Sequence, residues 1–384
     1  METDEPHLSP LRRFTSAVRW SWYAISLSWG GIAVLLHQTP HQFTGLNTIG
    51  TIVFIANLVI YALITGSFIF EALSPSPRPG KAAAAASGPP DFRTRWLHIQ
   101  QLTDLYFIPI SLLAFAAILF GVSYYGTPHC GRWLVLTLHA LFWVYTAVSL
   151  VLCVVLSWVI PHTHTTPEKH YPIVQILPFF PPMLSGTMAG ILAPHQPANL
   201  ARPMLVGGTT MQGLGILMFF VVLAQTAHTL TRSGLPEGKF RPEMFIAVGP
   251  PCFTIIAWYG MASAALEKLP DYYLSKASSV HTADVLYILA VAAGVSLWVL
   301  AFVQFWLAVL SMVDAMVRGL IAYELNWWCM VFPLTGFVLC TCNLGQALNS
   351  PAILWVGSAM TIGQVALWLV ICGCQIVVWV RRGW

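Results

Sequence analysis

Long apolar stretches alternate with short polar ones along the chain from residue 18 to residue 380. A helix needs about 20 mostly apolar residues to cross the hydrocarbon core of a bilayer, and each stretch reaches or approaches that length. Proline, glycine or charged residues mark the ends of the stretches, so the pattern predicts ten transmembrane helices. The predicted spans are 18–36, 48–71, 104–125, 132–160, 173–193, 204–230, 244–266, 283–316, 325–348 and 352–380.

Proline is distributed unevenly among these spans. The third, fifth, seventh and ninth contain internal prolines, the even-numbered spans contain none, and the first has a glycine pair at a comparable depth. A proline inside a helix leaves a carbonyl to be satisfied elsewhere, so in a membrane it must be covered by protein or water. The odd helices are therefore expected to be kinked. The expected break positions are Gly30, Gly31, Pro109, Pro181, Pro182, Pro250, Pro251 and Pro333.

The simplest arrangement is an all-α polytopic membrane protein in which ten transmembrane helices form five helical hairpins. The kinked odd helices surround a central pore, and the even helices face lipid or neighbouring subunits. An alternative explains the prolines by their general frequency in membrane helices. The hydroxyl groups that follow the breaks would then only satisfy freed carbonyls. These hydroxyl residues are Ser111, Ser185, Thr187, Thr254 and Thr335.

The composition supports the membrane interpretation. Hydrophobic residues make up 57% of the chain and charged residues only 8%, against about 25% in ordinary soluble domains. The net charge of +4 comes without a dense block of Lys and Arg, so no nucleic-acid partner is expected. The eight cysteines are scattered, and the close pairs Cys340/Cys342 and Cys372/Cys374 are two residues apart. Residues at this spacing point to different sides of a helix, which argues against a metal clamp or disulfide.

The positions of the 18 Lys and Arg residues predict an orientation. With the N-terminus in the cytosol, 14 of them fall on the cytosolic side and four on the outer side, which satisfies the positive-inside rule. Both termini are therefore expected to be cytosolic. Residues 1–16 form a tail, and residues 17–384 form one ten-helix transmembrane domain. The stretch 73–103 is expected to be a cytosolic linker between the second and third spans.

A membrane redox enzyme is an alternative, because 12 histidines and eight cysteines could ligate haem or metal. Haem-binding bundles need facing histidine pairs deep in the bilayer, and only His139 and His228 fall within predicted spans. The loop histidines His162, His164 and His170 lack neighbouring cysteines and a fixed spacing. We therefore expect no metal site, no cofactor and no enzymatic activity.

Four motifs carry a resemblance to a known family. They are 177–183 (LPFFPPM), 212–215 (QGLG), 241–253 (RPEMFIAVGPPCF) and 327–335 (WWCMVFPLT). They resemble the tellurite-resistance/dicarboxylate transporter family, and most closely its fungal malic acid transporter branch. Plant slow anion channels and fungal sulfite efflux pumps are also relatives. The resemblance runs from about Arg13 to the end of the tenth span.

The resemblance implies a ten-helix fold around a pore, often assembled as a homotrimer, and transport of C4-dicarboxylates such as malate and succinate. Sulfite export and a chloride or nitrate channel stay open as alternatives, because one fold can serve several substrates. A plasma-membrane location is expected. In channel-like relatives a phenylalanine on the ninth helix plugs the pore, and Phe332 matches it. An aromatic ring that fills the gap at a proline kink is the alternative for Phe332.

One departure from the malic acid branch concerns charge. Where that branch can carry arginines, this chain has Glu71 and His139. Neither Lys nor Arg lies well inside any predicted span. An anion would then be compensated by backbone amides and helix ends at the proline breaks, together with polar side chains. The substrate-pathway candidates are Ser185, Thr187, Thr254, Thr335, Asn343 and Arg241.

Three ionisable residues have two interpretations each. Arg241, at the mouth of the seventh span, either attracts anions or is a solvated helix entrance. His139 either supplies a proton-dependent positive charge or is a hydrogen-bonded packing residue. Asp104, at the start of the third span, is either a helix cap or a proton-linked carboxylate. Whether protons accompany the small organic anion is left open by the sequence.

Overall fold

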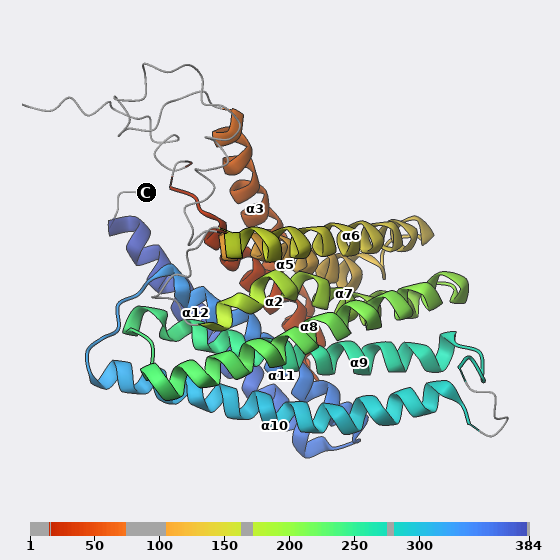
Figure 1. Ribbon diagram of the computed structural model, residues 1–384. Helices are drawn as coiled ribbons and strands as arrows, with labels where there is room; N and C mark the ends of the chain where they lie inside the picture. The colour runs from red at the N-terminus through yellow and green to blue at the C-terminus, as the bar shows by residue number, and fades with distance from the viewer. Residues whose placement is uncertain (1–14, 16, 74–104, 163–171, 275–279, 382–384) are drawn as a thin grey trace, which may run out of the picture.

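The computed structural model describes residues 15, 17–73, 105–162, 172–274 and 280–381, and within these residues every regular element is a helix (Figure 1). The ten long helices are α2 (Tyr23–Gln38), α3 (Leu46–Leu73), α5 (Ile108–Gly121), α6 (Arg132–His162), α7 (Phe180–Leu192), α8 (Ala198–Ser233), α9 (Gly249–Lys268), α10 (Thr282–Val317), α11 (Val331–Ala347) and α12 (Pro351–Arg381). The expected all-α polytopic fold is confirmed. The tail 1–14, the linker 74–103 and Asp104 lie outside the described residues.

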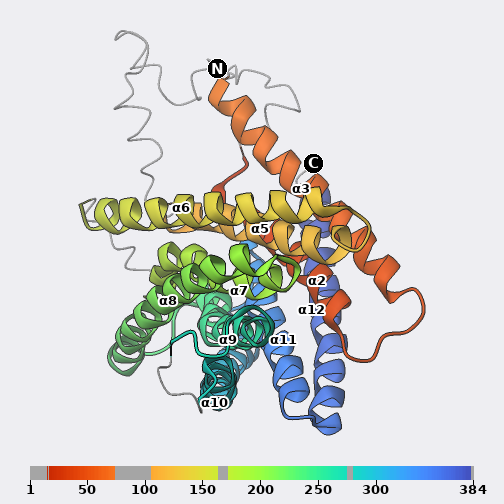
Figure 2. The ribbon, with the colours of Figure 1, turned by 90° about the vertical axis from the view of Figure 1, so that its right-hand side faces the viewer.

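Five of these helices form a closed ring. Each of α2, α5, α7 and α9 packs against the next, and α11 packs against both α9 and α2. We call these the inner helices. The outer helices α3, α6, α8, α10 and α12 each pack against the inner helix that precedes them in the chain. Figure 2 shows the inner group in the middle and the outer helices around it.

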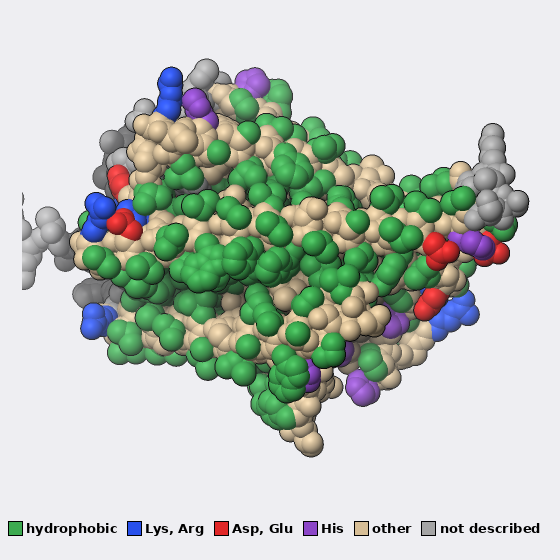
Figure 3. Space-filling model, turned by 90° about the horizontal axis from the view of Figure 1, so that it is seen from below, with side chains coloured by type: hydrophobic (Ala, Val, Ile, Leu, Met, Phe, Trp, Pro, Cys, Tyr) green, Lys and Arg blue, Asp and Glu red, His purple; other side chains and the backbone are tan. Residues whose placement is uncertain are grey.

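Burial separates the two groups as the prolines predicted. In the most apolar part of each span, 72–89% of the residues are buried for the spans containing α5, α7, α9 and α11. The same share is 22–39% for the spans of the outer helices, and 13 of the 16 residues of α2 are buried. Figure 3 shows hydrophobic side chains over the middle of one face and charged side chains at its two ends. This is the surface expected of helices in a bilayer.

Nine spans within the described residues are long and apolar enough to cross a membrane. The tenth helix, α2, has only 16 residues and follows a short 3₁₀ turn. The predicted spans match the ten helices, with the largest differences at the starts of the sixth and seventh. Both helical stretches begin six residues earlier, at Ala198 and Gly238. The polar residues there enter helical structure because they gain partners, as Arg241 does with Asp314.

The breaks in the inner helices are changes of helix type. Each inner α-helix follows a 3₁₀ segment, and Pro109, Pro181, Pro250 and Pro333 lie in the first turn of the α-helix after it. Proline is tolerated there because the first N–H groups of a helix have no intrahelical acceptor. The 3₁₀ segments are η1 (Trp20–Trp22), η2 (Leu105–Phe107), η4 (Pro172–Phe179), η6 (Gly238–Val248) and η7 (Leu325–Met330).

Side chains satisfy carbonyls near these transitions. Tyr145 of α6 donates to the Pro181 carbonyl at 3.0 Å, and Thr254 donates to the Pro250 carbonyl at 2.7 Å. Ser111 donates to the Ile108 carbonyl at 2.7 Å. Part of the hydroxyl pattern in the sequence is therefore explained by backbone satisfaction.

Two details of the proline and glycine pattern differ from expectation. Helix α2 runs through Gly30 and Gly31 without a change of helix type, so these residues do not break it. Their missing side chains serve close packing instead, because a Cβ at Gly30 would lie 2.8 Å from Ala117. Pro203 lies inside α8, because that helix begins at Ala198.

Candidate functional site: the cavity of the inner helix ring

A cavity of about 260 Å³ lies inside the ring and is lined by residues of all five inner helices and the short turns that follow α5 and α7. None of its lining residues comes from an outer helix. The wall consists of Gly31, Val34, Gln38, Ala117, Phe120, Tyr124, Thr187, Gly190, Ile191, Pro194, His195, Phe253, Ile256, Tyr259, Gly260, Phe332, Thr335, Leu339, Asn343 and Gln346. This is the central space that the proline pattern predicted.

Burial of the lining residues changes along the helices. Pro194, His195 and Gln346, at the C-terminal ends of the inner helices, are exposed. Thr187 and Thr335, nearer the N-terminal ends, are only 2% and 1% exposed. The cavity therefore has an open end, at the C-terminal ends of the inner helices, and a closed end near the transitions from 3₁₀ to α-helix.

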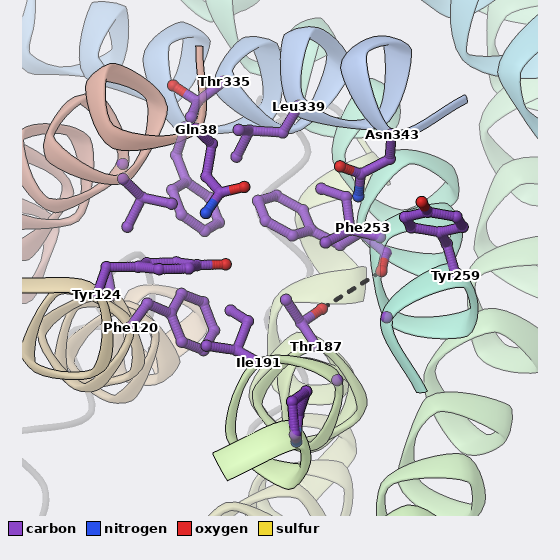
Figure 4. A pocket seen from close by; sticks show the side chains of 18 of the residues that line it. Gln38, Phe120, Tyr124, Thr187, Ile191, Phe253, Tyr259, Thr335, Leu339 and Asn343 are labelled. Carbon is purple, nitrogen blue, oxygen red and sulfur yellow. Dashed lines mark hydrogen bonds between the residues drawn. The ribbon is translucent and has the colours of Figure 1, made fainter. Parts of the chain in front are cut away.

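The polar side chains of the wall are amides, hydroxyls and the imidazole of His195. Figure 4 shows the labelled side chains of Gln38, Tyr124, Thr187, Tyr259 and Asn343 around one open space. The lining that the structure describes contains no Lys, Arg, Asp or Glu. Such groups can bind an anion weakly through N–H and O–H donors, which allows it to leave again.

Three phenylalanine rings pack together at the closed end. Phe332 of α11 stacks on Phe253 of α9 with centroids 4.6 Å apart and planes 15° from parallel. Phe180 of α7 meets both rings edge-on, at 5.8 Å from Phe253 and 6.4 Å from Phe332. All three side chains are at most 3% exposed. We call this group the aromatic layer, and it ends the cavity on the side of the 3₁₀ segments.

Glycines allow the inner helices to come this close. A Cβ at Gly31 would lie 3.1 Å from the Phe332 ring and 3.5 Å from the Thr335 side chain. Gly190 of α7 and Gly260 of α9 face each other, and a Cβ on either would lie 3.1 Å from the other's Cα. The width of the cavity thus depends on these bare backbone surfaces.

Comparison with known proteins identifies the family. The family model of the voltage-dependent anion channels, SLAC1, matches residues 17–376. The chain belongs to the SLAC1 family. It is 29% identical over 367 residues to the malic acid transport protein of Schizosaccharomyces pombe, covering 95% of this chain and 79% of that protein. It is 23% identical over 354 residues to a sulfite efflux pump of Arthroderma benhamiae, covering 91% of this chain and 88% of the pump.

Membership of the SLAC1 family decides the class of protein. These relatives are transporters and channels, so this multi-pass membrane protein transports anions and is not an enzyme. The family resemblance drawn from the four sequence motifs is confirmed. The redox alternative is set aside by the family. No group of three or more His, Cys, Asp or Glu side chains that could hold a metal ion occurs in the parts of the chain that the structure describes.

Four of the candidates named from the sequence line the SLAC1-family cavity. Thr187, Phe332, Thr335 and Asn343 come from α7 and α11 and surround the same space. Thr187 of α7 donates to the Phe253 carbonyl of the neighbouring helix α9 at 3.3 Å, as the dashed line in Figure 4 shows. Asn343 is half-buried and lies nearer the open end.

The candidates Ser185 and Thr254 do not line the cavity. Ser185 accepts a hydrogen bond from Thr146 of α6 at 3.2 Å. Thr254 accepts one from Gln212 of α8 at 2.8 Å. Both side chains therefore tie an inner helix to an outer one. Both side chains lie on the outward face of the helix ring. Their sequence distance from a proline does not predict which face they occupy.

Arg241 is buried and pairs with the partly exposed carboxylate of Asp314, away from the cavity lining. Its Nη1 atom donates to the Asp314 carboxylate at 2.7 Å and to the Ser311 carbonyl at 2.6 Å. The guanidinium is 7% exposed and joins η6 to α10. A buried guanidinium does not fit a solvated helix entrance, and the attraction of anions by Arg241 stays a prediction. Its partners in α10 are 70 or more residues away in the sequence.

The two charge candidates of the outer helices also lie off the cavity. His139 of α6 contacts the Met204 sulfur of α8, with Nδ1 to sulfur at 3.0 Å. Glu71 is near the end of α3 and partly exposed. The packing interpretation of His139 agrees with these contacts. Asp104 is not among the described residues.

Sequence reasoning missed most of the polar groups near the open end. Gln38, Tyr124, His195, Tyr259 and Gln346 line the cavity there. Gln38 and Gln346 lie at the ends of α2 and α11, Tyr124 and His195 lie in the turns after α5 and α7, and Tyr259 lies in the middle of α9. A search for polar residues at the C-terminal ends of the odd spans would have found all of them except Tyr259.

Thr187 and Ser185 provide a matched test of the cavity assignment. Replacing Thr187 by valine keeps its shape and removes a hydroxyl that can exchange its 3.3 Å bond to the Phe253 carbonyl for a bond to the anion. The KM for the transported anion is therefore expected to rise about two- to tenfold. Ser185→Ala removes a hydroxyl two residues away that faces α6, and the KM is expected to stay unchanged. Uptake kinetics in proteoliposomes measure both. A KM shift in Ser185→Ala alone would contradict the assignment.

Proposed function

We propose that the protein carries C4-dicarboxylates, with malate and succinate as substrates, through the cavity of the inner helix ring. The observation that carries the proposal is this cavity, lined by all five inner helices and by neutral polar groups. The substrate class is supported by the 29% identity to a malic acid transport protein.

The size and chemistry of the cavity suit a small organic acid. Its volume of about 260 Å³ lies just below the roughly 300–1,000 Å³ of pockets for drug-sized ligands. Amides and hydroxyls can donate to two carboxyl groups at once. Since the lining that the structure describes contains no Lys or Arg, the substrate is expected to bind weakly and pass onward.

In this proposal Thr187 and Asn343 contact the substrate, Thr335 lines the pathway at its closed end, and Phe332 is the gate. The Phe332 ring lies between the cavity and the 3₁₀ segments, where its movement would join the two sides. The alternative is that the Phe332 side chain only fills the gap at the kink. In that case removing the side chain would leave the uptake rate unchanged.

A sulfite efflux pump is the second candidate. It is favoured by the 23% identity to such a pump over 91% of this chain. Neutral donors bind an inorganic oxyanion as well as a carboxylate. Competition between the two anions separates the candidates.

The proposal also covers the location, orientation, domain organisation and assembly of the protein. We place it in the plasma membrane with both termini in the cytosol, as a single ten-helix domain over residues 17–384, and as a homotrimer. The orientation is supported by the excess of Lys and Arg on one side, and the single domain by the family model that matches residues 17–376. The plasma-membrane location and the homotrimer follow from the family resemblance. His139 and Asp104 are kept as the proton-linked candidates.

The first experiment measures uptake of radiolabelled malate into proteoliposomes, with and without an inward proton gradient. Succinate, sulfite and chloride serve as competitors. We expect saturable malate uptake that succinate inhibits, and stimulation by the gradient would show proton coupling. Sulfite or chloride flux without malate flux would instead assign the protein to the efflux-pump or channel branch.

A further inference from the structure

Each outer helix holds an inner helix through the hydrogen bond of a buried or partly buried side chain. The donors or acceptors on the outer helices lie opposite hydroxyl groups of the inner helices, with distances of 2.7–3.2 Å. The pairs are Asn57–Ser26, Thr146–Ser185, Gln212–Thr254, Trp298–Thr341 and Gln364–Thr335. Hydrogen bonds between helices of this kind stabilise membrane proteins.

One of these pairs differs from the others. Thr335 is the only hydroxyl partner among them that lines the cavity within the described residues. It lies one turn after the start of α11, three residues beyond Phe332, and is 1% exposed. Gln364, its partner on the outer helix α12, is 5% exposed. A lipid-facing helix thus reaches the closed end of the cavity through one side chain.

The hydrogen bonds around Thr335 fix the direction of its hydroxyl. Thr335 Oγ1 donates to the Val331 carbonyl at 2.9 Å. Gln364 Nε2 donates to the same carbonyl at 2.7 Å and to Thr335 Oγ1 at 3.2 Å. An amide nitrogen carries two hydrogens, so Gln364 can make both bonds together. In Figure 4 the Thr335 oxygen points away from the open space between the labelled side chains.

We propose that Gln364 is a positioning residue for the gate: it holds the Thr335 hydroxyl out of the pathway, so that the closed end beside Phe332 stays apolar. A narrow apolar constriction resists water and ions, and a hydroxyl that turns into it admits them. The space for this turn is on the α2 side, where Gly31 has no side chain and an added Cβ would lie 3.5 Å from Thr335 Oγ1. The inference rests on the proposed transport through this cavity.

The test replaces Gln364 by methionine, which has a similar length and no N–H donor. The maximal rate of malate uptake is expected to rise about two- to tenfold, because the hydrogen bond from Gln364 no longer holds the hydroxyl back and only its bond to the Val331 carbonyl remains. The KM is expected to stay unchanged, because the substrate contacts nearer the open end are intact. Gln364→Asn, too short to reach both partners, should give the same rise if the methionine variant does not reach the membrane.

Two further variants separate positioning from a general loss of packing. Gln212→Met removes the matching contact to Thr254, outside the cavity, and is expected to lower thermal stability without raising uptake. In a Thr335→Val background there is no hydroxyl to hold, so Gln364→Met is expected to have no further effect on the uptake rate. An equal effect with and without the Thr335 hydroxyl, or a Gln364→Met variant that behaves like Gln212→Met, would overturn the inference. Absence of anion uptake by the unmodified protein would instead refute the proposed function.

Discussion

Replacing Phe332 by alanine is expected to raise the maximal rate of anion uptake about ten- to hundredfold. The ring stacks on Phe253 and meets Phe180, and it is 3% exposed. To open the layer the ring must leave these contacts, which costs on the order of 1.5–3 kcal/mol for a buried phenylalanine. Alanine removes that barrier, and each 1.4 kcal/mol corresponds to about a tenfold change in rate. Radiolabelled uptake into proteoliposomes measures the change.

Phe337 is the matched control for Phe332. It lies on the same helix, is also 3% exposed, and its ring contacts Trp298 and Phe305 instead of the cavity. Phe337→Ala is expected to lower the free energy of unfolding by about 3–5 kcal/mol, as buried Phe→Ala changes do, without raising uptake. Unchanged uptake by a well-folded Phe332→Ala variant would remove the gate role and leave the ring as a filler of the kink.

Gly31→Leu is expected to reduce uptake at least about tenfold. The new Cβ would lie 3.1 Å from the Phe332 ring and 3.5 Å from Thr335, and Gly31 lines the cavity. The leucine side chain therefore occupies the narrow end and blocks movement of the ring. Overpacking of this kind costs about 1–3 kcal/mol where neighbours cannot move. Initial uptake rates and the amount of folded protein should be measured together.

Gly213 of α8 provides the control for that substitution. No atom lies within 4 Å of a Cβ built at this position, so Gly213→Leu adds the same side chain to open space. Uptake is expected to stay at the level of the unmodified protein. If Gly31→Leu transports normally, the pathway does not pass between α2 and α11 at this level.

The distinction between inner and outer helices could be predicted because it follows from local chemistry. A kinked helix needs cover for its freed carbonyls, and Pro109, Pro181, Pro250 and Pro333 all belong to helices of the ring. Long apolar runs likewise locate the spans without any knowledge of their partners. These two signals were enough to predict five hairpins around a central space.

The direction in which each side chain points was harder to predict. Thr187 lines the cavity while Ser185, two residues earlier, bonds to α6. Residues two apart in a helix point to nearly opposite sides, about 160° from each other. Which of the two sides faces the cavity depends on how the helix packs against its neighbours. Arg241 shows the same limit, because its partner Asp314 is 73 residues away.

The sequence by itself determined that this is a ten-helix membrane protein, which helices form its interior, and to which family it belongs. Span length, proline position and motif spacing are properties of consecutive residues, so they can be read without the fold. Only the tertiary structure decided which hydroxyls and amides share the cavity, that Phe332 stacks on Phe253, and that Gln364 of α12 reaches Thr335. These relations join residues distant along the chain, and they are fixed by how the helices rotate and pack against each other.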